Sequence, residues 1–196
     1  MNDAPSSDPL VALAQWHRDA MSAGVREPDA MTLATATAEG RPSARIVLYK
    51  GLMDGRVQFV SNYASRKGRE MDENPRVALV FFWPELARQV RIEGRAERSS
   101  AAVSEAYFAG RPRESQLGAW ASLQSQPLAS RVELERRLIE VAERFAGQTV
   151  TRPPAWGMYS VLPERVELWL GGAHRLHDRF VYTRQDNSWH IERLAP

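Results

Sequence analysis

The chain has 196 residues, 43% of them hydrophobic, and no cysteine, which excludes disulfides, thiolate nucleophiles and cysteine-ligated metals. Its formal net charge of +2 is too small to argue for a nucleic-acid partner. No apolar run approaches the ~20 residues that span a bilayer, and the N-terminus lacks the basic and apolar regions of a signal peptide. We therefore expect a single cytoplasmic domain over residues 1–196.

The first part of the chain predicts a helix followed by strands. Residues 1–7 are small and polar, and we expect them to be disordered. Asp8 is a suitable N-cap for a helix over residues 8–24, with Pro9 in its first turn. The pattern then changes to that of strands, which we predict at residues 31–37, 44–52 and 57–61, followed by a short polar helix over about 65–73.

The second part of the chain alternates between strands and helices. Ser130 and Glu133 form a capping box that opens a helix running to about residue 145. A turn at Asp186-Asn187 joins the last two strands. Residues 111–128 are rich in polar residues, Gly and Pro, and are expected to be irregular. The remaining elements are strands at 77–83, 89–97, 157–161, 165–170, 180–184 and 189–193 and a short helix at 101–109.

The sum is six to eight antiparallel strands with three or four helices and no regular βαβ alternation. A doubly wound parallel sheet is therefore not expected. We expect a mainly β, α+β protein: a small closed or nearly closed antiparallel barrel with helices outside it.

Four short segments carry residues suited to binding anions, and the first two lie early in the chain. On the strand from Arg45 to Lys50 these cations lie on opposite faces. The spacing alone favours a strand that ends in a solvated lysine, and the alternative is two cations near one anionic ligand. Ser61 to Lys67 enters a helix, where free backbone N–H groups attract phosphate. Because Arg66 and Lys67 oppose the helix dipole there, a solvated turn and an anion site are equally favoured.

The third and fourth segments lie later. Tyr107, Arg111, Arg113 and Ser115 surround a helix end, where they either satisfy its dipole or grip a phosphate. Residues 169–179 place two histidines, two arginines and a tryptophan in one loop. A metal there is set aside, because the flanking arginines would repel a cation.

Together these segments resemble the pyridoxamine 5′-phosphate oxidase family from about residue 31 to the end. The resemblance rests on motifs found in order along the chain. They are Arg45–Lys50, Ser65-Arg66-Lys67, Asn74-Pro75-Arg76, Arg88-Gln89-Val90, residues 111–120, residues 174–180 and Arg193-Leu194-Ala195-Pro196. The resemblance implies an FMN-binding split barrel and a homodimer with FMN at the subunit interface. It also implies oxidation of pyridoxine or pyridoxamine 5′-phosphate to pyridoxal 5′-phosphate by oxygen, with hydrogen peroxide as product and ammonia released from the amine.

The resemblance also implies roles for individual residues. Those expected to bind FMN are Arg45, Ile46, Val47, Lys50, Val60, Ser61, Arg66, Lys67, Gln89, Gln124, Ser125, Trp169 and Arg179. Gln124, Ser125, Trp169 and Arg179 would come from the partner chain. Those expected to bind substrate are Lys50, Tyr107, Arg111, Ser115, Arg175 and His177. Arg175 and His177 would lie over the pyridine ring as the catalytic pair, and no metal is implied.

Three other interpretations are compatible with the pattern. A related flavoenzyme could act on another substrate, such as a phenazine precursor, although the complete substrate-phosphate set argues against it. A flavin or pyridoxal-phosphate binding protein without turnover is disfavoured by Arg175 and His177. A nucleic-acid module would need exposed aromatic residues beside cations, whereas most tryptophans here fall in strand patterns.

Overall fold

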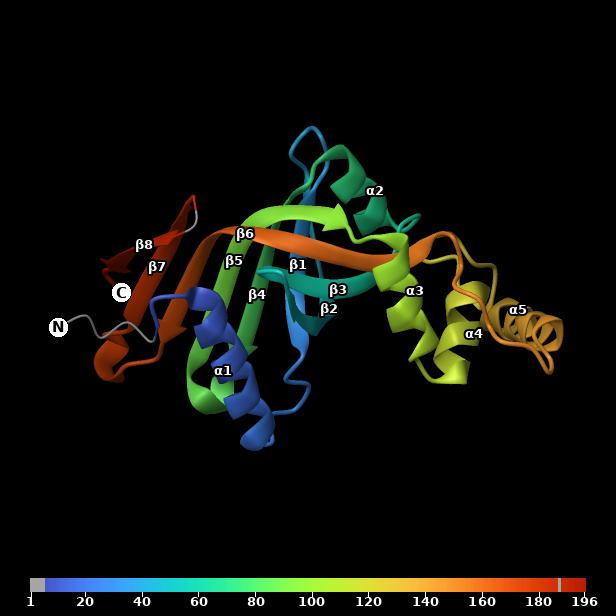
Figure 1. Ribbon diagram of the computed structural model, residues 1–196, viewed down its shortest axis with the longest axis horizontal. Helices are drawn as coiled ribbons and strands as arrows, with labels where there is room; N and C mark the ends of the chain where they lie inside the picture. The colour runs from blue at the N-terminus through green and yellow to red at the C-terminus, as the bar shows by residue number, and fades with distance from the viewer. Residues whose placement is uncertain (1–5, 187) are drawn as a thin grey trace.

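The computed structural model describes residues 6–186 and 188–196 (Figure 1). Within them are five α-helices: α1 (Pro9–Ser22), α2 (Arg66–Glu73), α3 (Ala101–Ala109), α4 (Arg113–Ala121) and α5 (Arg131–Arg144). The eight strands are β1 (Ala30–Ala36), β2 (Pro42–Met53), β3 (Arg56–Asn62), β4 (Arg76–Trp83), β5 (Arg88–Arg98), β6 (Trp156–Leu170), β7 (Asp178–Gln185) and β8 (Ser188–Leu194). Two short 3-10 helices are η1 (Pro84–Leu86) and η2 (Ala173–Arg175).

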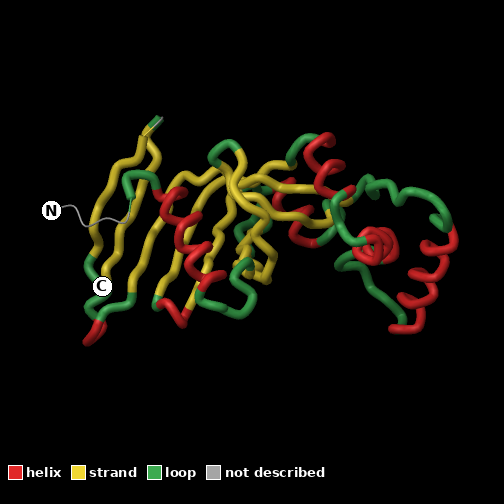
Figure 2. Tube along the Cα trace, turned by 60° about the horizontal axis from the view of Figure 1, so that its bottom comes forward, coloured by secondary structure: helices red, strands yellow, loops and turns green. Residues whose placement is uncertain are grey.

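All the strands pair antiparallel in the order β3-β2-β1-β4-β5-β6-β7-β8, and a further pairing of β3 with β6 closes the first six into a barrel. β7 and β8 form a hairpin outside the barrel, at the opposite end of the molecule from α3, α4 and α5 (Figures 1 and 2). The predicted antiparallel split barrel with peripheral helices is therefore confirmed.

Alternation along the strands fills the barrel with apolar side chains. Four that expose no surface are Leu33, Leu79, Phe81 and Ile92. The outward face of the same strands is also apolar: Ile46, Leu48 and Phe82 are 62%, 42% and 57% exposed. Thr32 pairs with both Ile46 and Val80, so these strands present one continuous surface, which we call the outer face. Such a face is typical of an interaction surface.

β6 differs from the sequence prediction, because the two strands expected over residues 157–161 and 165–170 are a single strand. Pro163 lies between the two predicted strands, and a proline cannot donate a hydrogen bond to a sheet. Here it lies where β6 changes neighbours, from β3 up to Val161 to β7 from Arg165 onward. The missing N–H therefore falls in the gap between two pairings, and the strand continues.

Helices α1 and α5 begin at the N-caps that the sequence predicts, whereas α4 was not predicted. The Asp8 carboxylate accepts a hydrogen bond from Leu10 N at the start of α1, and the Ser130 hydroxyl accepts one from Glu133 N at the start of α5. The expectation that residues 111–128 are irregular is wrong for Arg113–Ala121, where α4 forms. Its buried Gln116 donates to the carbonyls of Phe108 and Ala109 at the end of α3. Tertiary contact, not local propensity, explains this helix.

A second, smaller core lies among α3, α4, α5 and the start of β6. Its buried members are Phe108, Phe145, Val150 and Trp156.

Two sequence predictions concern residues that the structure does not describe. They are residues 1–5 of the segment expected to be disordered and Asn187 of the last turn. The proposal of a single domain over the whole chain remains a prediction.

Candidate active site

Several cationic side chains lie around the start of α2. Ser65 caps the helix by accepting a hydrogen bond from Gly68 N at 3.3 Å. Lys67 Nζ lies 3.2 Å from Ser61 Oγ, 3.4 Å from Ser65 Oγ and 2.9 Å from Gln124 Oε1. Burial and the nearby Arg45 lower the pKa of Lys67. We call this group the α2 corner, and its members are Arg45, Ser61, Ser65, Arg66, Lys67 and Glu70.

The α2 corner contains one residue that sequence reasoning missed. Glu70 is buried and lies 2.8 Å from Arg66 Nε and 3.2 Å from Arg45 Nη2. The spacing of Arg66 and Glu70, four residues apart on a helix, was the available signal.

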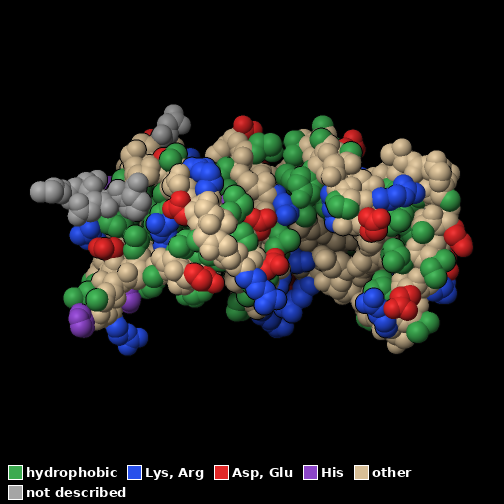
Figure 3. All heavy atoms as spheres, turned by 90° about the horizontal axis from the view of Figure 1, so that it is seen from below, with side chains coloured by type: hydrophobic (Ala, Val, Ile, Leu, Met, Phe, Trp, Pro, Cys, Tyr) green, Lys and Arg blue, Asp and Glu red, His purple; other side chains and the backbone are tan. Residues whose placement is uncertain are grey.

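A pocket of about 410 Å³ adjoins the α2 corner. We call it the α4 pocket, and it is lined by Val60, Ser61, Asn62, Arg111, Ser115, Gly118, Ala119, Ser122, Gln124 and Trp156. Ser61 and Gln124 line the pocket and also contact Lys67, so Lys67 adjoins the space that Arg111 lines. Figure 3 shows Lys and Arg side chains beside a hollow between the strands and the helices at one end.

Arg111 is the unsatisfied group of this pocket. Its guanidinium lies over the Trp156 ring, 4.7 Å from the centroid, and among the described residues its buried Nη1 has no hydrogen-bond partner. Burial also lowers the pKa of Arg111. Buried donors in native proteins have partners, so this nitrogen is suited to an acceptor supplied by a ligand. The pocket is therefore suited to an anionic ligand.

Some neighbours of Arg111 lie at the pocket, and others contact only the surrounding protein. Ser115 lines the pocket, and the Tyr107 ring stacks on Trp156 with centroids 6.3 Å apart. Arg113, which the sequence left as either a helix-end residue or a phosphate ligand, donates to the carbonyls of Phe145 and Gln148 at 2.7 and 3.0 Å. Arg113 therefore links the start of α4 to the end of α5.

Lys50 lies elsewhere. Its Nζ is 3.9 Å from Asp29 Oδ2, in a cavity of about 340 Å³ that His17 of α1 also lines. Within one chain the predicted substrate-phosphate set is thus divided, with Lys50 apart from Arg111 and Ser115. Of its strand neighbours, Val47 is in the core and Ile46 is on the outer face.

The other predicted flavin residues form a row on the sheet. Gln89 of β5 pairs with Trp169 of β6, which pairs with Arg179 of β7, and we call these three the sheet row. Gln89 also pairs with the exposed Phe82, so the row continues the outer face. Directly paired residues project from the same side of a sheet.

Arg179 of the sheet row is held by a buried carboxylate. Its Nε lies 2.9 Å from Glu167 Oε1, and Arg91 lies 3.1 Å from the other oxygen. The hydrogen bond to Glu167 raises the pKa of Arg179. Its Nη1 also donates to the Ala195 carbonyl at 3.0 Å.

The loop after β6 brings His177 to the sheet row. The His177 and Trp169 rings have centroids 4.6 Å apart. Gly172 N donates to His177 Nδ1 at 3.1 Å, so in the neutral ring the proton lies on Nε2. Arg175 is exposed and has a left-handed backbone with φ of 64°.

The α4 pocket and the sheet row lie at opposite ends of one strand. Trp156 lines the pocket and Trp169 belongs to the row, and an extended strand of this length spans on the order of 40 Å. Figure 1 shows the same separation between α4 and the start of β7. Within one chain, the two groups cannot contact the same small ligand.

Gln124, expected from the partner chain, contacts Lys67 of its own chain and so belongs with the pocket. Ser125 follows it, exposed and with φ of 68°. Of the residues expected from the partner, Trp169 and Arg179 are the pair that lies far from the pocket.

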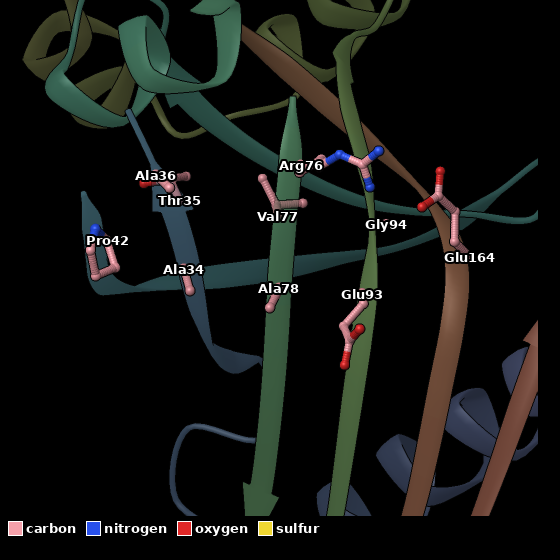
Figure 4. Close-up of a pocket in the computed structure, with 10 residues that line it drawn as sticks. All are labelled: Ala34, Thr35, Ala36, Pro42, Arg76, Val77, Ala78, Glu93, Gly94 and Glu164. Carbon is pink, nitrogen blue, oxygen red and sulfur yellow. The ribbon is translucent and has the colours of Figure 1, made fainter. Parts of the chain in front are cut away.

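A further cavity of about 340 Å³ crosses β1, β4, β5 and β6 (Figure 4). Its floor is formed by small residues such as Ala34, Ala78 and Gly94, and its polar side chains include two carboxylates, Glu93 and Glu164. Among the predicted site residues, none lines it.

Within the described chain, no cluster of three or more His, Asp or Glu suits a metal ion. No helix there is long and apolar enough to cross a membrane.

Known proteins resemble this chain over its whole length. The family model described as pyridoxamine 5′-phosphate oxidase matches residues 18–145, and the one described as pyridoxine 5′-phosphate oxidase C-terminal dimerisation region matches residues 156–196. A pyridoxine/pyridoxamine 5′-phosphate oxidase from Rubrobacter xylanophilus is 56% identical, covering 99% of this chain and 89% of the relative. One from Chromobacterium violaceum is 53% identical, covering 96% and 89%.

Two solved structures have the same fold. PhzG from Burkholderia lata 383, in complex with tetrahydrophenazine-1-carboxylic acid, has a TM-score of 0.93 at 34% identity, covering 99% of this chain and 95% of that one. A pyridoxamine 5′-phosphate oxidase-related, FMN-binding protein from Nostoc punctiforme has a TM-score of 0.77 at 17% identity, covering 97% and 100%. At that identity the second likeness concerns the fold alone.

Proposed function

Because the chain belongs to the pyridoxamine 5′-phosphate oxidase family, we propose that it oxidises pyridoxine and pyridoxamine 5′-phosphates to pyridoxal 5′-phosphate with bound FMN. Oxygen is reduced to hydrogen peroxide, and the amine substrate also takes up water and releases ammonia. The single observation that carries the proposal is the α4 pocket, where Arg111 Nη1 is buried without a partner among the described residues and Lys67 lies beside the lining residues Ser61 and Gln124. FMN and the substrate each bring a phosphate to such a site.

The α2 corner suits the FMN phosphate. Lys67, Ser61 and the free N–H groups that open α2 provide charge and donors there. Trp169 and Gln89 of the sheet row would border the flavin ring, with Arg179 beside them. When bound, FMN supplies the acceptor for the hydride that leaves the substrate.

The α4 pocket suits the substrate phosphate. Arg111 would grip it through the nitrogen that has no partner in the described chain, with Ser115 and Tyr107 beside it. Phosphate binding far from the reacting carbon fixes the geometry of the reaction. In its neutral form His177 carries the proton on Nε2 and would donate to an oxygen of the pyridine ring, and Arg175 would lie over the same ring.

The partner is a second copy of the chain, and FMN lies between the two. The chain carries its family's C-terminal dimerisation region. The sheet row adjoins the exposed Ile46, Leu48 and Phe82 of the outer face, so covering this face with a second chain would also cover the row. In a twofold dimer the row of one protomer can meet the α4 pocket of the other.

One alternative has a specific observation in its favour, since the PhzG structure superimposes closely. The oxidase is favoured because relatives of that name are more than 50% identical, against 34% for PhzG. Cytoplasmic location and the absence of a nucleic-acid partner remain predictions.

The experiment is a spectral titration. The purified protein should show a flavin spectrum, and pyridoxine 5′-phosphate added without oxygen should bleach it; air should restore it. Bound flavin that pyridoxine 5′-phosphate leaves oxidised would overturn the proposal. Bleaching by tetrahydrophenazine-1-carboxylic acid in its place would favour the PhzG-like alternative.

A further inference from the structure

Glu70 is an acidic side chain at the centre of a cationic site. Its side chain is 5% exposed, and the residues around it come from three elements: Thr35 of β1, Arg45 of β2 and Arg66 of its own helix. A buried carboxylate is costly unless paired and hydrogen-bonded. Its place beside a proposed phosphate site therefore needs an explanation.

The contacts make Glu70 the hub of a closed network. Oε2 accepts from Thr35 Oγ1 at 2.5 Å and from Arg45 Nη2 at 3.2 Å, while Oε1 accepts from Arg66 Nε at 2.8 Å. Thr35 Oγ1 in turn accepts from Arg45 Nη1 at 2.6 Å. The network thereby fixes the start of α2 against β1 and β2.

Arg45 is almost fully committed to this network. Besides Thr35 and Glu70, its terminal nitrogens donate to Leu33 O at 3.2 Å and Ser43 Oγ at 2.8 Å. All four terminal N–H groups therefore have partners inside the protein. Arg45 is oriented as part of the wall of the site, and Glu70 is the anion that orients it.

Charge gives Glu70 a second role. Arg45, Arg66 and Lys67 carry three positive charges and Glu70 one negative charge, so the corner has a formal charge of +2. A phosphate monoester carries about −2 near neutral pH. Burial would raise the pKa of Glu70, but hydrogen bonds from Thr35, Arg66 and Arg45 outweigh burial and hold it below its usual range. Glu70 is thus ionised at neutral pH.

We propose that Glu70 is a positioning residue of the FMN-phosphate site, which holds Arg45 and Arg66 in place and sets the charge of the corner to match a phosphate dianion. This inference rests on the proposed function, because it takes the α2 corner as the site of the FMN phosphate. It predicts that Glu70 affects binding of the phosphate group and not of the flavin ring.

The test compares FMN with riboflavin, which lacks the phosphate, on the apoprotein by flavin fluorescence. We expect Glu70→Gln, which keeps the shape and removes the charge, to raise the Kd for FMN about tenfold and to leave that for riboflavin within about twofold. Glu73→Gln removes the same charge from an exposed position on α2 and should change neither. An unchanged preference for FMN in Glu70→Gln, or a tighter one, overturns the inference.

A second pair of variants covers the case in which Glu70→Gln does not fold. Thr35→Val removes the hydroxyl that links Arg45 to Glu70 and should reduce the preference for FMN, whereas Thr35→Ser keeps the hydroxyl and should retain it. Equal preferences in the two would contradict the network. If the wild-type protein itself binds riboflavin as tightly as FMN, the proposed phosphate site fails; if it prefers FMN and the variants do too, only the role of Glu70 fails.

Discussion

Arg111 and Arg113 are two residues apart, yet their guanidinium groups meet different surroundings. Arg113 is satisfied by two backbone carbonyls at the end of α5. Arg111 lies on the Trp156 ring and, within the described residues, keeps a buried nitrogen without a partner. A buried donor left unpaired is costly, so Arg111 is the one suited to a ligand.

This difference gives a prediction for matched substitutions. Arg111→Lys should raise the KM for pyridoxine 5′-phosphate about tenfold, because lysine lacks the planar fork that binds phosphate through two hydrogen bonds. The kcat and the FMN content should change little. Arg113→Lys should lower the melting temperature and leave KM unchanged. Steady-state kinetics on both variants provide the check, and equal KM shifts would contradict the assignment.

At the residue scale, the sequence indicated which residues were chemically suited to a site but not which of them meet. An anion site at the start of α2 could be suggested from the sequence, because helix N-termini attract phosphate. Arg113 and Lys50 could not be assigned, because their partners, the end of α5 and Asp29, depend on tertiary packing. Glu70 had a local signal in its spacing from Arg66, but its contact with Arg45 depends on the packing of α2 against β2.

Among the elements, β6 connects the most strands, because it pairs with β3, β5 and β7. It pairs with β5 along most of its length, closes the barrel against β3 at one end and supports β7 at the other. A register shift at Glu93 and Gly94 accompanies the change of neighbours. A Cβ on Gly94 would lie 2.1 Å from the Leu162 carbonyl oxygen, so the close approach of the two strands requires glycine there.

We therefore expect Gly94→Ala to destabilise the protein by roughly 1–3 kcal/mol, as overpacking does in a filled core. Gly118→Ala is the matched control, because a Cβ on this helical glycine meets open space. It should stabilise by about 0.5–1 kcal/mol, the usual gain from replacing a helical glycine. Urea unfolding measures both. A Gly94→Ala protein as stable as the wild type would show that the strands can move apart at no cost.

The elements that could be predicted were those whose signals are local. Asp8 and Ser130 marked helix starts, and alternating apolar residues marked most strands. α4 was missed because its stabilising contact, from Gln116 to the end of α3, lies outside any local pattern. β6 was divided in two because Pro163 reads as a break unless the change of partner strand is known.

At the scale of the whole molecule, one chain does not bring all the proposed site residues together. The α4 pocket and the sheet row are separated by the length of β6 (Figures 1 and 2). Residue types could suggest both groups, but they could not reveal this separation. The proposed activity therefore requires two protomers, each supplying a pocket to one site and a sheet row with its loop to the other.

The direct test is a heterodimer of two inactive variants, Arg111→Ala in one chain and His177→Ala in the other, isolated with two different affinity tags. If each site combines the pocket of one protomer with the loop of its partner, one of the two sites in the heterodimer is intact. Activity should then return to about half that of the wild-type dimer, as twofold symmetry requires. A heterodimer as inactive as the two parent variants would show that each chain builds its own site, and would contradict the account.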